Sequence, residues 1–320
     1  MNTKKGFVAA FKDFWFRAGD FRGSSTRGQY WWIFLIDLLL GVVLGIAVGV
    51  LTVATLAGVG SSGTRSPLQF MGSAAGIPFI VALGIFLFQG LPMLTLSIRR
   101  YQDAGVTPWL LLLTWLAPAL ITSLSGRNVA ALIIASILYL IGFIIIPLLP
   151  TRHPEPQWST RPNEDGQKAS MLSAIPDFFR RGGVFSGRSS RSQYWWIILW
   201  SVIIGLGGFI LMMIGSIFFL VLGSHPGRMD VDLSGYYAFR SIFVWLASLV
   251  YLPSLTLVIR RFRDAGINPW WYGVLTLLQV VVSVGLILSK QYAASWIATA
   301  VILVIEVIIT ALPTKQTAHI

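Results

Sequence analysis

The sequence predicts an all-α integral membrane protein with eight transmembrane helices, arranged as two parallel four-helix repeats. Three observations support this prediction. Of the 320 residues, 55% are hydrophobic and only 11% are charged, whereas soluble domains carry about 25% charged residues. The apolar residues gather in runs of the length that crosses a bilayer, and both halves of the chain carry the same motifs in the same order. This composition argues against a soluble enzyme and against a disordered chain.

The repeats are visible as three blocks that recur in order. Between the two copies lies a segment rich in proline and charge, which is typical of a solvated linker. We therefore expect a first repeat at residues 1–151, a linker at 152–171 and a second repeat at 172–320. The matching blocks are FRGSSTRGQYWW (21–32) with FSGRSSRSQYWW (185–196), LPMLTLSIRRYQDAGVTPW (91–109) with LPSLTLVIRRFRDAGINPW (252–270), and LPT (149–151) with LPT (312–314).

Each repeat contains four apolar runs that we expect to be helices, since about 20 apolar residues cross a hydrocarbon core of ~30 Å. The third run of the first repeat is short and contains Pro118. The alternative is therefore that one short run in each repeat is re-entrant or interfacial. The expected runs are 30–56, 77–98, 108–124 and 129–149 in the first repeat, and 194–222, 242–259, 270–289 and 293–312 in the second.

The distribution of charge predicts the orientation. With four helices per repeat, both termini, the linker and the loop after each second helix share one side of the membrane. That side carries 19 of the 24 Lys and Arg residues, and the other side carries 5. The positive-inside rule then places both termini in the cytoplasm and makes the repeats parallel. The net charge of +12 follows from this bias, and no nucleic-acid-binding motif accompanies it.

An Arg-x-Gln-Tyr-Trp-Trp motif begins the first helix of each repeat, after an amphipathic segment at 7–15 or 172–179 that is typical of a short surface helix. Tyr and Trp favour the headgroup level of a bilayer, and an Arg beside them can bind phosphate. The motif predicts either a plain aromatic belt or a site for anionic lipid headgroups. Its residues are Arg27, Tyr30, Trp31 and Trp32 in the first repeat and Arg191, Tyr194, Trp195 and Trp196 in the second.

A second motif, Arg-Arg-x-x-Asp-Ala-Gly, ends the second helix of each repeat. Gly105 and Gly266 suit the left-handed position that terminates a helix, and Pro-Trp three residues later begins the next one. We expect a tight cytoplasmic turn whose arginines also bind lipid or a partner. These arginines are Arg99, Arg100, Arg260 and Arg261.

Asp103 and Asp264 lie in the last turn of these second helices, where the helix dipole disfavours a carboxylate. Each can pair with the arginine four residues earlier, Arg99 or Arg260. We also expect each aspartate to pair with the arginine that begins the first helix of the same repeat. Such an ion pair would clamp the first helix to the second.

Two further acids, Asp37 and Glu306, lie inside apolar runs. Intramembrane acids are costly and usually face the interior of a helix bundle, so they are candidates for function. One interpretation is a shared proton or cation site between the first and last helices. The other is a carboxylate that is protonated or paired with arginine, since no chain of polar residues leads away from either position.

The chain offers little material for an enzyme. It has no cysteine, and its three histidines lie far apart in the sequence, at 153, 225 and 319. It also lacks a phosphate-binding glycine loop, a serine nucleophile elbow and an acid pair at catalytic spacing. We therefore expect no catalytic residues, no bound metal, no cofactor and no nucleic-acid partner.

The GRxSRxQYWW-like and RRxRDAGxxPW-like blocks resemble the domain of unknown function 805 family, small bacterial inner-membrane proteins, over about 8–151 and 172–314. The resemblance implies a tandem fusion in a bacterial cytoplasmic membrane, and it supplies no established activity or ligand. We expect a non-enzymatic scaffold or assembly factor that binds anionic lipid or other membrane proteins at a cytoplasmic collar formed by the two motifs. The alternative is a small transporter or channel for a proton or cation that uses the intramembrane acids.

Overall fold

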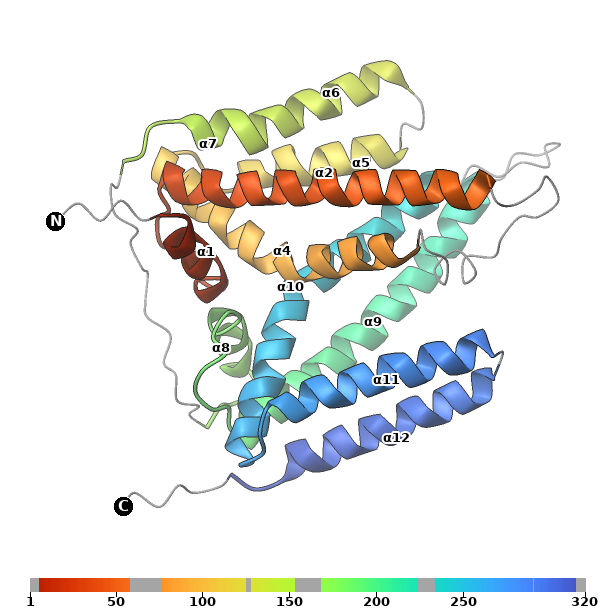
Figure 1. Cartoon of the computed structure of the whole chain (residues 1–320). Coiled ribbons are helices and arrows are strands. Elements are labelled where there is room, and N and C mark those ends of the chain that lie inside the picture. The colour runs from red at the N-terminus through yellow and green to blue at the C-terminus, as the bar shows by residue number, and fades with distance from the viewer. Residues whose placement is uncertain are drawn as a thin grey trace. The chain divides into compact units, whose positions relative to one another are not determined.

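The computed structural model describes residues 6–57, 76–124, 128–152, 168–223, 234–289 and 291–314, and every regular element within these ranges is helical (Figure 1). The predicted all-α class is confirmed for this part of the chain. The first repeat contains α1 (Phe7–Phe16), α2 (Arg27–Ala57), α4 (Gly76–Ala104), the π-helical η1 (Leu112–Leu116) continuing into α5 (Ala117–Leu124), and α6 (Val129–Leu140) continuing through η2 (Ile141–Ile145) into α7 (Ile146–Leu148).

The second repeat follows the same order. Its last two helices, α11 and α12, run side by side as an antiparallel pair (Figure 1). The elements of this repeat are α8 (Ala174–Arg180), α9 (Arg191–Gly223), α10 (Ser234–Asp264), α11 (Trp270–Leu288) and α12 (Tyr292–Ala311).

Six of the described helices are long and apolar enough to cross a membrane, which fits a multi-pass membrane protein. The third apolar helix of each repeat, Leu112–Thr122 or Trp270–Leu286, is shorter. At 1.5 Å per residue the first of these extends about 16 Å, well below the ~30 Å of a hydrocarbon core. The spans that meet the length requirement are Arg27–Val53, Pro78–Ala104, Val129–Leu148, Arg191–Phe219, Ala238–Asp264 and Ala293–Ala311.

The chain divides into two compact units, and α2, α4, α9 and α10 each contribute to both. The start of α2, the end of α4 and the end of α7 belong to the first unit, and the equivalent parts of the second repeat belong to the second unit. The first unit comprises Met1–Asp37, Leu87–Arg161 and Leu199–Leu252, and the second comprises Leu38–Phe86, Pro162–Ile198 and Pro253–Ile320.

Each unit contains a small hydrophobic core where the first two long helices of a repeat meet the short helix before them. In the first unit Phe14 of α1 packs with Tyr30 and Ile33 of α2 and with Leu96 of α4. The equivalent core of the second unit contains Ala174, Phe178, Tyr194, Ile197 and Leu257. The short amphipathic helices α1 and α8 therefore each bury one apolar face against the long helices.

The helix stops predicted at the two glycines are confirmed. Gly105 and Gly266 both adopt a φ of 75°, which glycine accepts without steric cost. The N–H of Val106 donates to the carbonyl of Tyr101 over 2.9 Å, the hydrogen bond of a Schellman motif. The N–H of Ile267 donates likewise to the carbonyl of Phe262 over 3.0 Å, so the backbone closes the turn in both repeats.

Candidate functional site

The first arginine of the Arg-Arg pair in the first repeat, Arg99, is fully buried beneath the loop between α1 and α2. Its Nη1 donates to the carbonyl oxygens of Arg17, at 2.5 Å, and Asp20, at 3.0 Å. Its Nε donates to the hydroxyl of Ser25 at 2.9 Å. Because a buried guanidinium needs acceptors, these three bonds fix the path of the loop against α4.

Arg260 repeats this geometry in the second unit. Its Nη1 donates to the carbonyl oxygens of Arg181, at 2.6 Å, and Val184, at 2.7 Å, and its Nε donates to the hydroxyl of Ser189 at 3.0 Å. The three acceptors lie 164 residues after those of Arg99, which is the spacing of the first repeated block. The two repeats therefore fold the same loop onto the same arginine.

The second arginine of the pair, Arg100, is also buried and holds the end of the fourth helix. It donates to the carbonyl oxygens of Pro147 and Leu149 and to the carboxylate of Asp103. The last carbonyls of a helix lack partners within the helix and carry the negative end of its dipole, so a cation stabilises them. Arg261 makes the equivalent bonds to Thr310, Leu312 and Asp264.

The partner expected for each aspartate requires a correction. Asp103 and Asp264 pair with the arginine three residues earlier, Arg100 or Arg261, and not with the arginine four residues earlier. Both spacings place two side chains on the same helix face, but the earlier arginine is already committed to the loop. Asp264 also accepts a hydrogen bond from the hydroxyl of Thr314, over 2.9 Å.

The arginines that begin the first helices, Arg27 and Arg191, are exposed. Within the described residues they take no part in the two aspartate ion pairs. The backbone N–H of Arg27 donates to the hydroxyl of Thr151 over 3.2 Å, which ties the first turn of α2 to the segment after α7. The expected ion pair between the first and second helices is therefore not found among the described residues. The buried arginines instead join the second helix to the loop before the first helix and to the end of the fourth helix.

The aromatic residues of the first motif divide between the core and the surface. Tyr30 is 1% exposed, and its hydroxyl donates to the carbonyl of Phe143 at 3.1 Å. Tyr194 is 8% exposed. Trp31 and Trp196 are half-buried against the two hydrophobic cores. Only Trp32, at 41%, and Trp195, at 37%, are exposed.

These positions revise the set of residues that were expected to bind lipid or a partner. A buried guanidinium whose donors face backbone carbonyls is not available to a headgroup, and a buried tyrosine cannot anchor at the bilayer surface. The accessible members of the set are Arg27, Trp32, Arg191 and Trp195. The members that are buried and contact other parts of the protein are Tyr30, Tyr194, Arg99, Arg100, Arg260 and Arg261.

Sequence reasoning missed a further buried arginine in each repeat, Arg17 and Arg181. The Nη2 of Arg17 donates to the carboxylate of Asp20 at 2.8 Å, and its Nη1 donates to the carbonyl of Ser24 at 3.1 Å. Extending the alignment at a spacing of 164 would have found this pair, because Asp13 and Gln29 around Arg17 also have identical residues at that spacing. We name Arg17, Arg99 and Arg100 the first arginine cluster, and Arg181, Arg260 and Arg261 the second.

The two intramembrane acids have different surroundings. Asp37 accepts a hydrogen bond from the amide of Gln89 at 3.0 Å. Glu306 is half-buried on α12 and belongs to the other compact unit. Within the part of the chain that the structure describes, no group of three or more His, Asp or Glu residues could hold a metal ion.

From the buried ion pair in the first arginine cluster we expect that the effects of substituting Arg100 and Asp103 on the free energy of unfolding are strongly coupled. Arg100→Met removes the cation that pairs with a buried carboxylate and donates to two carbonyls at a helix end, so we expect a loss of about 3–5 kcal/mol in the free energy of unfolding. Arg100→Met combined with Asp103→Leu should lose less than the sum of the two single changes. Denaturant unfolding in detergent, monitored by tryptophan fluorescence, measures the free energy of unfolding of each variant. Arg27→Gln is the exposed control, and an equally small effect of Arg100→Met would contradict the assignment.

Comparison with known proteins identifies the family. The model of the family described as protein of unknown function (DUF805) matches the chain twice, at residues 18–154 and 183–318. No curated protein and no solved structure matches the chain. Each matched stretch contains one Arg-Arg-x-x-Asp-Ala-Gly motif and its buried arginine pair. The chain therefore belongs to the DUF805 family and carries two tandem copies of its domain.

Proposed function

We propose that this protein is a non-enzymatic scaffold or assembly factor of the bacterial cytoplasmic membrane, which binds anionic lipid or partner membrane proteins at its basic and aromatic collar. The observation that carries the proposal is the exposure of Arg27 with Trp32, and of Arg191 with Trp195, at the start of α2 and α9. Both repeats expose one arginine and one tryptophan within the first two turns of this helix, although Trp32 is equivalent to Trp196 and Trp195 is equivalent to Trp31. An exposed guanidinium and an exposed indole at the same helix end suit a phosphate at the headgroup level.

The buried arginine clusters support this role by holding the exposed groups in place. Arg99 and Arg260 fix the loop that leads into the first helix, and Arg100 and Arg261 fix the end of the fourth helix beside it. A lipid that binds at Arg27 or Arg191 would therefore meet a surface that is already ordered. Ordering a binding surface in advance lowers the cost of binding.

The proposal includes eight spans with both termini in the cytoplasm. Six described helices meet the length of a span, and the excess of Lys and Arg on one side of the predicted topology favours the cytoplasm for that side. The third helix of each repeat would then have to cross a locally thinned bilayer, or its flanking residues would have to complete the span. The bacterial cytoplasmic membrane is the location that the family resemblance implies.

Single cysteines can test this topology, because the chain has none of its own. Thr107→Cys and Asn268→Cys should react with an impermeant maleimide only from the cytoplasmic side, like Lys12→Cys. Val129→Cys and Gln291→Cys, which follow the short third helices, should react only from the opposite side. Thr107→Cys and Val129→Cys flank the third helix of the first repeat, and Asn268→Cys and Gln291→Cys flank that of the second. Labelling of both cysteines of one repeat from the same side would show that its third helix is re-entrant. Labelling of Lys12→Cys from outside would overturn the orientation.

Loss of the exposed arginines should reduce the retention of acidic lipid. Native mass spectrometry of protein extracted gently from its membrane should detect bound anionic phospholipid, and Arg27→Gln with Arg191→Gln should lose it, because the phosphate loses its charged donors. Arg240→Gln is the matched control, since Arg240 is exposed near the opposite end of a long helix. Equal retention by the double variant and the wild type would contradict the proposal.

A second candidate function, a small transporter or channel for a proton or cation, is favoured by the contact between Asp37 and Gln89. The two side chains meet within apolar helices α2 and α4. An intramembrane carboxylate held by an amide suits the binding of a proton or a cation. Glu306 on α12 is a second acid away from the ends of such a span, whereas Asp103 and Asp264 lie in the last turn of theirs.

Flux measurements separate the two candidates. If the protein is a transporter, proteoliposomes should show a proton or cation flux that Asp37→Asn or Glu306→Gln abolishes, because each change removes the ionisable group. The scaffold proposal expects no flux above that of empty liposomes. Wild-type flux that survives both substitutions would exclude these acids from the pathway.

A further inference from the structure

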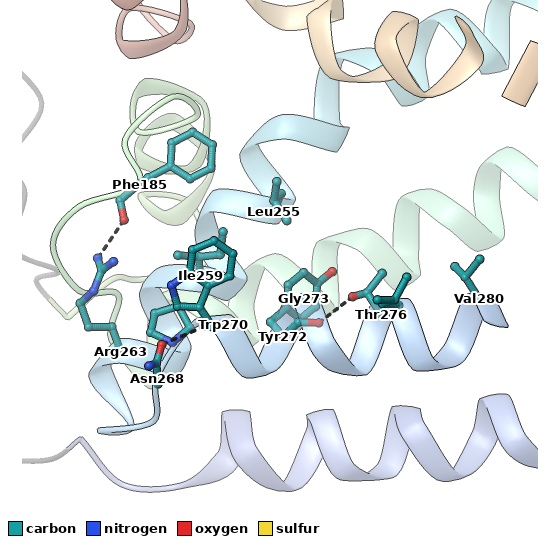
Figure 2. A pocket seen from close by; sticks show the side chains of 12 residues that line it. Phe185, Leu255, Ile259, Arg263, Asn268, Trp270, Tyr272, Gly273, Thr276 and Val280 are labelled. Carbon is teal, nitrogen blue, oxygen red and sulfur yellow. Dashed lines mark hydrogen bonds between the residues drawn. The ribbon is translucent and has the colours of Figure 1, made fainter. Parts of the chain in front are cut away.

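A groove of about 840 Å³ lies between the C-terminal end of α10 and one face of α11 (Figure 2). Most of its lining is apolar, with Leu255 and Ile259 contributed by α10 and Leu277 and Val280 by α11. Polar groups gather at one end, where Arg263 and Asn268 lie near Trp270 (Figure 2). The groove is therefore amphipathic along its length, and all of its lining belongs to the second compact unit.

The length of the groove indicates whether an acyl chain or a transmembrane helix would fit it. From Trp270 to Val280 the helix rises about 15 Å at 1.5 Å per residue. This is about half of the ~30 Å hydrocarbon core, or one leaflet. A partner helix that crosses the membrane would need a contact surface of the full thickness, whereas one acyl chain occupies one leaflet. The groove therefore fits a lipid chain better than a transmembrane partner.

The charged end of the groove indicates which charge a bound lipid headgroup would carry. The Nη1 of Arg263 donates to the carbonyl oxygens of Phe185, at 2.8 Å, and Gly187, at 2.9 Å. Among the described residues no acceptor is shown for its Nε and Nη2, and the side chain is partly exposed. Nε and Nη2 lie along one edge of the planar guanidinium group. A guanidinium edge of this kind can bind a phosphate through two parallel hydrogen bonds. The end of the groove is therefore suited to an anionic phosphate group.

The first repeat shows that this charge is not needed for folding the loop. Gln102 takes the place of Arg263, and its amide donates to the carbonyl of Phe21, the equivalent of Phe185, at 3.1 Å. A neutral amide therefore supplies the hydrogen bond that the loop requires. The positive charge of Arg263 is present in the second repeat and absent from the equivalent position of the first.

The space in the groove is also a feature of the second repeat. Gly273 lines it four residues after the proline of the Pro-Trp pair, and a Cβ at this glycine would meet nothing within 4 Å. The residue four positions after the matching proline in the first repeat is Leu112. Likewise, Thr276 lines the groove where the first repeat has Trp115. Small side chains thus leave room beside Arg263.

We propose that the second repeat binds one anionic phospholipid in this groove, with the phosphate at Arg263 and one acyl chain along α11. The proposal deepens the proposed function and rests on its premise that anionic lipid is a ligand of the protein. It assigns the lipid to one repeat, whereas the exposed arginines at the start of α2 and α9 occur in both. The chain should therefore hold one lipid more firmly than the rest.

The test compares two variants that remove the charge or the space. Full-length protein is reconstituted in nanodiscs of phosphatidylglycerol mixed with phosphatidylcholine, released in the mass spectrometer, and its bound lipids are counted. Wild-type protein should retain one phosphatidylglycerol molecule. Arg263→Gln should retain it at least about tenfold more weakly, because the phosphate loses a hydrogen bond to a charged group. Gly273→Leu should also lose it. Arg240→Gln on α10 and Gly285→Leu on α11, where a Cβ also meets open space, are the matched controls.

Each outcome decides a different point. Retention of the lipid by both Arg263→Gln and Gly273→Leu overturns the groove site, and if Arg27→Gln with Arg191→Gln still loses lipid, the proposed function survives alone. Loss with Gly273→Leu but not with Arg263→Gln contradicts the phosphate contact. Loss with the control variants as well contradicts any specific site. Wild type without preference for phosphatidylglycerol over phosphatidylcholine refutes both the groove site and the proposed lipid ligand.

Discussion

Two adjacent buried arginines at the end of the second long helix organise each repeat. Successive residues of a helix point about 100° apart, so Arg99 reaches the loop before α2 while Arg100 reaches the end of α7. Burying a guanidinium without acceptors is costly, and both segments present carbonyl oxygens to these two arginines. A single dipeptide thus joins three parts of the chain that lie far apart in the sequence, and Arg260 with Arg261 does the same in the second repeat.

This arrangement separates the structural arginines from the accessible ones. The buried clusters donate to carbonyl oxygens and carboxylates of the protein itself, whereas Arg27 and Arg191 remain exposed at helix starts that the clusters hold in position. The same division applies to the aromatic motif, in which the tyrosines enter the hydrophobic cores and one tryptophan of each pair stays at the surface. A strongly basic motif in a membrane protein can therefore owe most of its charge to folding, with a minority available for ligands.

Much of the fold follows from the sequence, because its determinants are local. Apolar runs predict the long helices, and Gly105 and Gly266 predict the helix stops, since only glycine adopts their φ without cost. The side of the helix that meets another segment depends on non-local packing, so the sequence did not indicate that Arg99 and Tyr30 would be buried. The aspartate partner was missed for a related reason: i,i+3 and i,i+4 spacings are equivalent on an isolated helix, and only the loop decides between them.

The acceptors of Arg99 and Arg260 are mostly main-chain oxygens, which every amino acid possesses. The loop can therefore exchange its side chains while keeping its shape, as the two repeats illustrate: Asp20 and Val184 occupy the same place, differ in charge, and offer the same carbonyl to the arginine. Natural selection can thus alter the polarity of this surface without reworking the architecture beneath it. Duplication of such a unit leaves each copy free to acquire its own ligand while the scaffold of both stays unchanged.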